Sequence, residues 1–133
     1  MSISNLSGNQ KRRMRSASRL YAVQALFQME AIGQVVDQVI SEFEDHRFGA
    51  SYDEIEYEDG NIDHFRHVVA AAVNHQAKID QMTDRALVAK WPIGRIDPTL
   101  RALFRAAGAE LVENTAPAKV VIAEYMDVAT AFF

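Results

Sequence analysis

The chain has 133 residues, of which 49% are hydrophobic and 24% are charged. This balance is typical of one globular domain that buries its own core, and it argues against wholesale disorder. The sequence contains no cysteine, which excludes disulfides, thiolate catalysis and cysteine-based metal sites. No apolar run approaches the roughly 20 residues of a membrane helix, and no secretory signal follows the N-terminus. We therefore expect a cytoplasmic protein without a membrane partner.

Charge is distributed unevenly along the sequence. The net charge is −4, yet residues 1–20 contain no acidic side chain and five basic ones: Lys11, Arg12, Arg13, Arg15 and Arg19. The remainder of the chain carries twice as many acidic as basic side chains. A short basic arm on an acidic body predicts a localised anion-binding site.

The first helix is predicted from about Arg12 to Ala31, because this stretch is rich in helix formers and lacks Gly and Pro. Residues 1–10 are polar, and we expect them to form a flexible tail before a single domain over residues 11–133. Gly33 stands where the helix would end. An apolar stripe at helical spacing is formed by Leu20, Val23, Phe27 and Ala31.

Two further helices are predicted on either side of an acidic connection over residues 44–60. The alternation of Tyr52, Ile55 and Tyr57 in this connection is too weak to predict a strand. Asn61 is a candidate N-cap for the helix that follows, which either continues or breaks near Lys78. The apolar faces of the two helices comprise Val36, Ile40 and Phe43, and then Phe65, Val69, Ala72 and Ile79.

The last third of the chain predicts two more helices. Asp97 is a suitable N-cap, and Pro98 fits the first helical position, where its missing N–H costs nothing. A break at residues 114–117 precedes a final helix from about Pro117. Their apolar stripes comprise Leu100, Phe104, Ala107 and Leu111, and then Val121, Tyr125, Val128 and Phe132. With five or six helices predicted and no competing strand, the fold class is all-α, a helical bundle.

Motifs of enzymes and metalloproteins are absent from the sequence. His64 and His67 stand three residues apart with Asp63 nearby, but no H-E-x-x-H motif accompanies them. The acidic segment lacks the spacing of a calcium loop. There is neither a G-x-S-x-G motif nor a Gly-rich phosphate loop. We therefore predict a protein that is not an enzyme and that uses no metal or cofactor.

The basic arm is the one feature that indicates a ligand. Like charges so close on a helix repel one another unless an anion neutralises them, and the helix dipole disfavours cations at this end. RNA phosphates would neutralise them, and arginine also stacks on unpaired bases. A solvated helix start is the alternative interpretation.

Two stretches of the chain resemble the NusB family. Residues 12–28 are similar to the family's opening helix, an arginine-rich start followed by A-x-Q-A-L-Y/F. Residues 91–132 are similar to its later motifs, approximately R-I, L-R, E-L, P-x-K-V-x-I-N-E and L-A-K-x-F. The matching residues of the last two are Pro117–Glu124 and Val128–Phe132. Each motif is weak, but their order and spacing together are specific.

The resemblance implies two packed three-helix subdomains and a role in transcription antitermination. A member would bind boxA-type single-stranded RNA together with a small-subunit ribosomal protein (NusE), within a complex on RNA polymerase. It would contact RNA through the arginine-rich start, which here comprises Lys11, Arg12, Arg13, Arg15 and Arg19. Phe27 matches the aromatic residue that ends the first motif, and it would face the ribosomal protein.

The sequence departs from the family pattern at three places. Ala123 stands where the family has Asn, and Ser16 and Ala17 dilute the arginine run. The chain ends at Phe133, where the family continues into a further helix, so the last helix is expected to be missing. The apolar surface left exposed would then favour a homo-oligomer.

Two other functions remain open at this point. The same fold forms the N-terminal RNA-binding domain of some ribosomal RNA cytosine methyltransferases, and the chain could be such a fragment. It could also be a helical scaffold that binds a protein and no RNA. Salt dependence distinguishes them, because phosphate binding weakens steeply with salt and an apolar interface does not.

Overall fold

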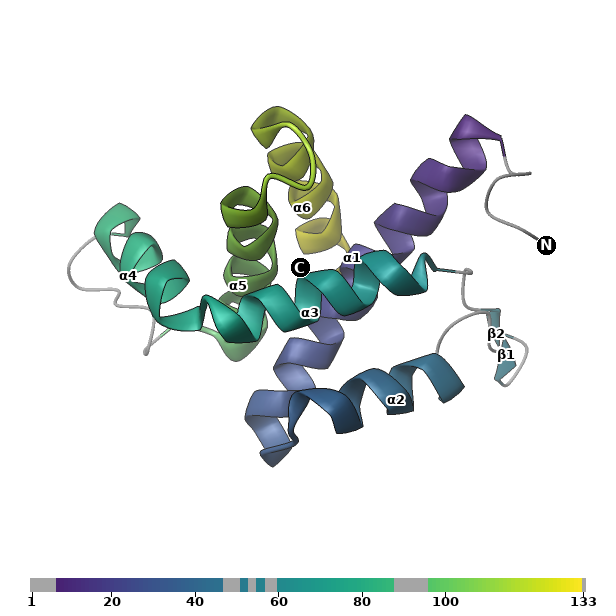
Figure 1. The fold of residues 1–133 in the computed structure, drawn as a ribbon, viewed down its shortest axis with the longest axis horizontal. Coiled ribbons are helices and arrows are strands. Elements are labelled where there is room, and N and C mark those ends of the chain that lie inside the picture. Colours follow the sequence, from purple (N-terminus) through teal and green to yellow (C-terminus); the bar gives the residue numbers. More distant parts are fainter. Residues whose placement is uncertain (1–6, 47–50, 53–54, 57–59, 88–95, 133) are drawn as a thin grey trace.

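The computed structural model describes residues 7–46, 51–52, 55–56, 60–87 and 96–132. Within these ranges the chain forms six α-helices and one pair of two-residue strands (Figure 1). The all-α prediction is therefore confirmed. Trp91 and Arg95, which belong to the second matching stretch, lie outside the described residues. None of the described helices is long and apolar enough to cross a membrane.

Helix α1 (Gly8–Ile32) begins four residues before the predicted start at Arg12. The reason is a capping box: the Ser7 side chain accepts from the Gln10 amide, and the Gln10 side chain accepts from the Ser7 amide. Residues 8–10 of the expected tail are thus helical. The helix ends as predicted at Gly33, whose φ of 71° lies in the left-handed region.

Helices α2 (Val36–His46) and α3 (Ile62–Asn74) flank the acidic connection. That connection contains a minimal antiparallel pair, β1 (Ser51–Tyr52) and β2 (Ile55–Glu56), where the sequence predicted no strand. Asn61 caps α3 as predicted, since its side chain accepts from the amide of the third helical residue. The predicted break near Lys78 falls at His75, and α4 (Gln76–Ala86) follows.

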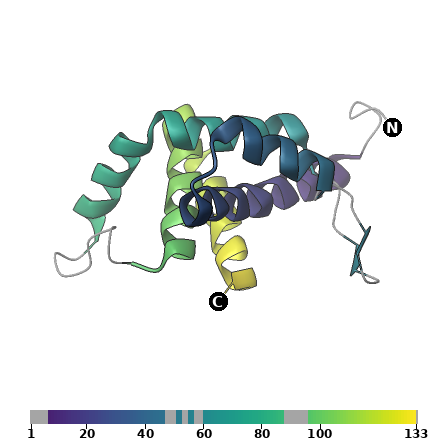
Figure 2. The same cartoon turned by 90° about the horizontal axis from the view of Figure 1, so that it is seen from below.

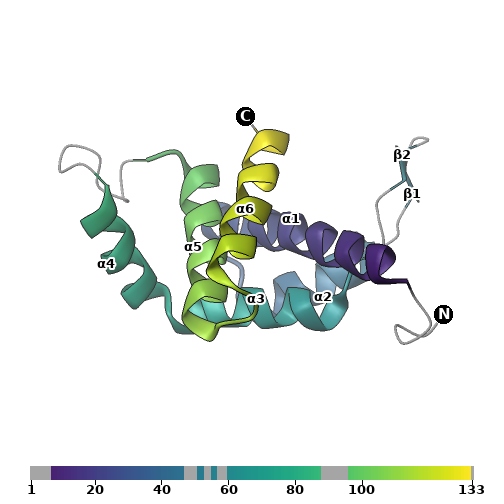
Figure 3. The same cartoon turned by 90° about the horizontal axis from the view of Figure 1, so that it is seen from above.

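Helices α5 (Pro98–Glu113) and α6 (Ala118–Phe132) match their predictions. Asp97 accepts from the Thr99 amide at 2.8 Å, and Pro98 occupies the first turn. Asn114 ends α5 in the left-handed conformation with a φ of 52°. The turn from residue 114 to 117 then reverses the chain, so α5 and α6 lie side by side (Figure 3).

The core lies where α1 and α5 meet. Helix α1 contacts α2, α3, α5 and α6, and it runs alongside α2 in Figure 2. Helix α5 contacts α1, α3, α4 and α6. Phe43 and Phe65 stack with ring centroids 5.7 Å apart, joining α2 to α3. Because α1 contacts helices from both ends of the chain, the division into two three-helix subdomains stays a prediction.

Candidate nucleic-acid interface

Four of the five predicted basic residues lie on the exposed first half of α1: Lys11, Arg12, Arg13 and Arg15. They do not all face the same way. Arg12 and Arg13 line a groove of about 640 Å³ between α1 and α6, whereas Lys11 and Arg15 are not among its lining residues. Of the four exposed basic residues, only Arg12 and Arg13 therefore line this concave surface.

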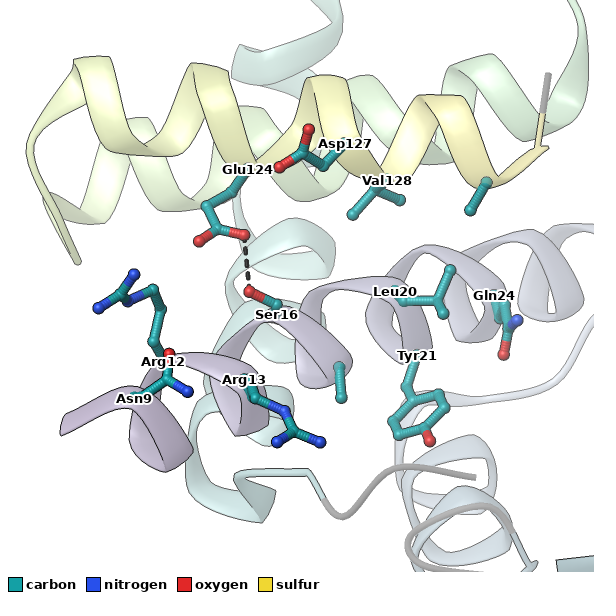
Figure 4. Close-up of a pocket in the computed structure, with 12 residues that line it drawn as sticks. Asn9, Arg12, Arg13, Ser16, Leu20, Tyr21, Gln24, Glu124, Asp127 and Val128 are labelled. Carbon is teal, nitrogen blue, oxygen red and sulfur yellow. Dashed lines mark hydrogen bonds between the residues drawn. The ribbon is translucent and has the colours of Figure 1, made fainter. Parts of the chain in front are cut away.

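Both polar and apolar side chains line the groove (Figure 4). Arg12 and Arg13 stand on the α1 side, and the carboxylates of Glu124 and Asp127 stand on the α6 side. The apolar part of its lining comprises Ala17, Leu20, Val128 and Ala131, and Tyr21 and Gln24 of α1 also line it. One face of the protein thus combines cations, carboxylates and an apolar surface.

Arg19 does not belong to this surface, which corrects the prediction. The residue is only 3% exposed, and its guanidinium faces the Glu110 carboxylate of α5. The Nε–Oε2 distance is 2.8 Å, and the Nη2–Oε1 distance is 3.2 Å. A buried guanidinium needs such a partner, because transferring an unpaired charge from water into the interior is very costly. Arg19 therefore acts within the core and cannot reach an RNA phosphate.

Glu110 is the centre of a buried polar cluster that joins four segments of the chain. Besides Arg19, the Tyr125 hydroxyl donates to it at 2.5 Å and the Thr115 hydroxyl at 2.7 Å. The His64 Nε2 atom lies 3.1 Å from its Oε1 atom. Burial alone would raise the Glu110 pKa, but these four neighbours outweigh burial and hold that pKa well below its ordinary value. Glu110 is therefore ionised in the folded protein.

Tyr125 completes this cluster from α6. Burial, together with the adjacent Glu110 charge, raises the pKa of Tyr125 well above its usual range. The hydroxyl therefore stays protonated and serves as a hydrogen-bond donor. Through Tyr125 and Arg19, the Glu110 carboxylate connects α6 and α1 to α5.

A second carboxylate ties the two walls of the groove directly. Glu124 of α6 accepts a hydrogen bond from the Ser16 hydroxyl of α1 at 2.8 Å. Its other oxygen lies 3.6 Å from Nη1 of Arg19. These contacts join α1 to α6 beside the groove. Ser16, which dilutes the arginine run in sequence, has a positional role here.

Phe27 lies on the opposite end of α1 from the arginine arm. Its side chain is 39% exposed, although a place on the apolar stripe favoured burial. It lines a second depression, of about 410 Å³, together with Ile32, Phe43, Thr99 and Phe132 among others. An exposed aromatic residue beside other apolar side chains is typical of a protein-binding surface.

Two arginines of α5 have structural roles. Arg101 donates to Glu30 at the C-terminal end of α1, with an Nε–Oε2 distance of 3.0 Å. Arg105 forms a two-point pair with Asp80 of α4 at 3.0 and 2.9 Å. Hydrogen bonding from Arg101 lowers the pKa of Glu30 against the opposing effect of burial. These pairs fasten α1 and α4 to α5.

Sequence reasoning missed the acidic half of the site. Glu110 follows Leu103 and Ala106 at helical spacing, which places it on the buried face of α5. A carboxylate on such a face requires a buried cation, and Arg19 stands on the buried face of α1 in the same way. A carboxylate and a guanidinium on the buried faces of two helices could therefore have predicted the Arg19–Glu110 pair from the sequence. No comparable signal marks Asp127, because it is an ordinary exposed residue of α6.

Comparisons with known proteins agree with this geometry. The family model described as "NusB family" matches residues 16–133. A NusB transcription antitermination protein of Maricaulis maris is 47% identical over 122 residues, covering 91% of this chain and 76% of the relative. The corresponding protein of Brucella abortus (strain S19) is 43% identical over 120 residues, covering 90% of this chain and 70% of the relative.

Solved structures share the fold. A crystal structure of the antitermination factors NusB and NusE in complex with dsRNA matches with a TM-score of 0.70 and 21% identity. The match covers 90% of this chain and 83% of that one. A chain in a crystal structure of a plectonemic RNA supercoil matches with a TM-score of 0.71, also at 21% identity, covering 90% of this chain and 82% of that one. The chain therefore belongs to the NusB family, a family of transcription antitermination proteins and not of enzymes.

Proposed function

We propose that this protein binds boxA-type single-stranded RNA through the first half of α1 and acts with the ribosomal protein NusE in transcription antitermination. The observation that carries the proposal is the groove between α1 and α6, which Arg12 and Arg13 line. The chain as a whole is acidic, so a local cluster of exposed arginines is where an RNA backbone would bind.

Binding would proceed in two stages. The exposed cations Lys11, Arg12, Arg13 and Arg15 attract the phosphate backbone and release its counterions, which supplies affinity without sequence preference. The groove then receives unpaired bases, whose faces and edges are accessible only in single strands. The related NusB–NusE structure holds double-stranded RNA. A duplex hides its base edges, so we expect this groove to favour single strands over duplexes of the same sequence.

The Phe27 surface is the proposed contact for NusE. It lies apart from the arginine arm on the same helix, so RNA and protein would bind along α1 without competing for one surface. When RNA and NusE bind the protein in one complex, each binding event raises the effective concentration of the other component. A protein with a small RNA surface would therefore gain RNA affinity from NusE. The pair would then join an RNA polymerase complex in the cytoplasm, where ribosomal RNA is transcribed.

Self-association is a further proposed interaction. Helix α6 exposes four large apolar side chains, Val120, Ile122, Met126 and Phe132, of which Met126 is 66% exposed. A second copy is one partner that would cover them. Sedimentation at increasing concentration tests this: a constant monomer mass would exclude it.

The proposal is tested by binding of a boxA-type RNA with and without purified NusE. We expect NusE to strengthen RNA binding by the wild-type protein, and a duplex of the same sequence to compete poorly. Phe27→Ala should keep the affinity for RNA alone and lose the strengthening by NusE. Strengthening by NusE without any RNA affinity of the chain itself would instead favour a protein-binding scaffold.

A further inference from the structure

Three polar side chains form a series of hydrogen bonds across the turn between α1 and α2. Gln28 of α1 donates from Nε2 to Oε1 of Gln34, which lies in that turn, at 2.6 Å. Gln34 donates from its own Nε2 to Oε2 of Glu42 on α2, at 2.9 Å. The two helices joined in this way run alongside each other (Figure 2). We refer to Gln28, Gln34 and Glu42 as the amide relay.

The carboxylate at the outer end of the relay sets the direction of each hydrogen bond in it. A carboxylate accepts and cannot donate, so Gln34 turns its NH2 group toward Glu42. The Gln34 oxygen then faces Gln28, which donates its own NH2 group to it. Because the oxygen and nitrogen of an amide lie on opposite sides of its carbon, the Gln28 oxygen is directed away from Gln34.

The inner end of the relay lies at the Phe27 surface. Gln28 lines the depression of about 410 Å³ together with Phe27, Ile32 and Phe132. Glu42 lies outside that lining, on an exposed side of α2. None of the described residues that line the depression is charged. Apolar contacts and the orientation of polar groups therefore decide which partner fits there.

We infer that Glu42 is a positioning residue for the protein partner of the Phe27 surface. Through Gln34 it directs the Gln28 oxygen, and not the Gln28 NH2 group, toward that partner. The partner segment therefore combines an apolar side chain, which contacts Phe27, with an N–H or O–H donor for the Gln28 oxygen. This inference rests on the proposed contact with NusE and extends it from an apolar surface to a hydrogen bond of fixed direction.

Reversing the charge at the outer end should reverse the relay. An ammonium group donates and cannot accept, so in Glu42→Lys the Gln34 oxygen turns toward position 42 and its NH2 group turns toward Gln28. Gln28 then accepts with its oxygen and presents its NH2 group to the partner. One hydrogen bond is lost and two donors face each other, so binding of purified NusE, measured by calorimetry, should weaken about tenfold.

Asp45→Lys is the matched control for this charge reversal. Asp45 is also an exposed residue of α2, but it is not part of the relay. Both variants change the net charge by the same amount, so a general electrostatic effect on NusE binding appears in both. Only Glu42→Lys should show the additional loss of affinity. Urea midpoints close to that of the wild type should accompany both variants, because both side chains are exposed.

A second substitution separates hydrogen-bond direction from a purely structural role of the relay. Gln28→Glu supplies an acceptor that cannot be turned into a donor, so it should bind NusE within about twofold of the wild type. In the Gln28→Glu background, Glu42→Lys should cost no more affinity than Asp45→Lys does. If the relay only held the turn between α1 and α2 in place, the loss would persist in the double variant, and the inference would be wrong.

The same measurements distinguish failure of the inference from failure of the proposed function. Equal binding by Glu42→Lys and Asp45→Lys, with Phe27→Ala still weakening the complex, would overturn the inference and leave the Phe27 contact intact. If neither Phe27→Ala nor Glu42→Lys weakens the complex, NusE binds elsewhere and both proposals are wrong.

Discussion

Arg19 of α1 and Glu110 of α5 form a two-point ion pair in the protein interior, with side chains 4% and 0% exposed. The pair explains why an arginine that continues the basic arm in sequence is absent from the RNA surface. It also joins the helix that carries the exposed arginines to the helix at the centre of the fold. The position of the candidate RNA site therefore depends on a buried interaction.

Removing one partner of this pair should destabilise the protein strongly. Glu110→Gln leaves the Arg19 charge buried with only the more distant Glu124 to compensate, and we expect a loss of about 3 kcal/mol in the free energy of unfolding. Urea denaturation measures it. Glu113→Gln is the matched control on the same helix, because Glu113 pairs with His75 near the surface. The control should change stability by less than about 1 kcal/mol, and equal losses in both variants would contradict the assigned role.

Stability should fall in acid because of the same carboxylate. The folded state holds the Glu110 pKa well below its ordinary value of 4.5, so the unfolded state binds a proton at higher pH than the folded state does. The stabilisation is therefore complete above about pH 4.5 and is lost as the pH falls below it toward the folded pKa. Urea midpoints between about pH 3 and pH 6 should decline less steeply for Glu110→Gln than for wild type. Parallel profiles would show that Glu110 contributes nothing to the acid sensitivity.

The close approach of α4 and α5 should depend on Gly108. A Cβ atom at this position would lie 2.5 Å from Cγ2 of Ile79, a stiff β-branched side chain in the core. Overpacking should outweigh the gain in helix propensity, so Gly108→Ala should cost about 1–2 kcal/mol. Gly8→Ala has open space around it and should be neutral or slightly stabilising.

A second substitution tests the cause of the Gly108 effect by thermal denaturation. Ile79→Leu moves the branch away from the Cβ atom and should recover part of the stability lost in Gly108→Ala. If Gly108→Ala were as stable as wild type, α4 and α5 could move apart to accommodate the added Cβ atom at no cost. The predicted dependence on Gly108 would then be wrong.

Phe27 and Phe65 should respond in opposite ways to substitution. Phe65 is fully buried, so Phe65→Ala should cost about 3–5 kcal/mol. Phe27 is 39% exposed, so Phe27→Ala should cost much less in stability while weakening the complex with NusE. Denaturation and pull-down with purified NusE measure the two effects. A large stability loss with an unchanged complex would place Phe27 in the core instead.

Local signals in the sequence determined most of the helices correctly. Gly33 ends α1 in the left-handed conformation, which glycine adopts easily. The side chains of Asn61 and Asp97 accept hydrogen bonds from first-turn amides and so mark the starts of α3 and α5. The start of α1 was placed too late, because the capping box at Ser7 lies within a polar stretch that resembles a tail. Local patterns thus predict helix ends well where the capping residue stands beside an apolar run.

The site was predicted less completely, because its organisation depends on contacts between distant residues. Charge alone grouped Arg12 with Arg19, although helix geometry turns the first toward solvent and the second toward Glu110, 91 positions away in sequence. Likewise, Phe27 was on the predicted apolar stripe, yet the buried face of α1 is centred on Ala22, Val23 and Leu26. Pairings of this kind become visible only when the helices are packed together.

The most direct test of the account is the salt dependence of RNA binding by the wild-type chain and the double variant Arg12→Ala/Arg13→Ala. Affinity for a boxA-type single strand should fall linearly on a double-logarithmic plot against salt concentration. Two lost phosphate contacts should reduce the slope by about 1.4. Arg85→Ala, on the exposed surface of α4, should leave the slope unchanged. A wild-type affinity that does not vary with salt, or identical slopes for wild type and the double variant, would contradict RNA binding at the α1 arginines.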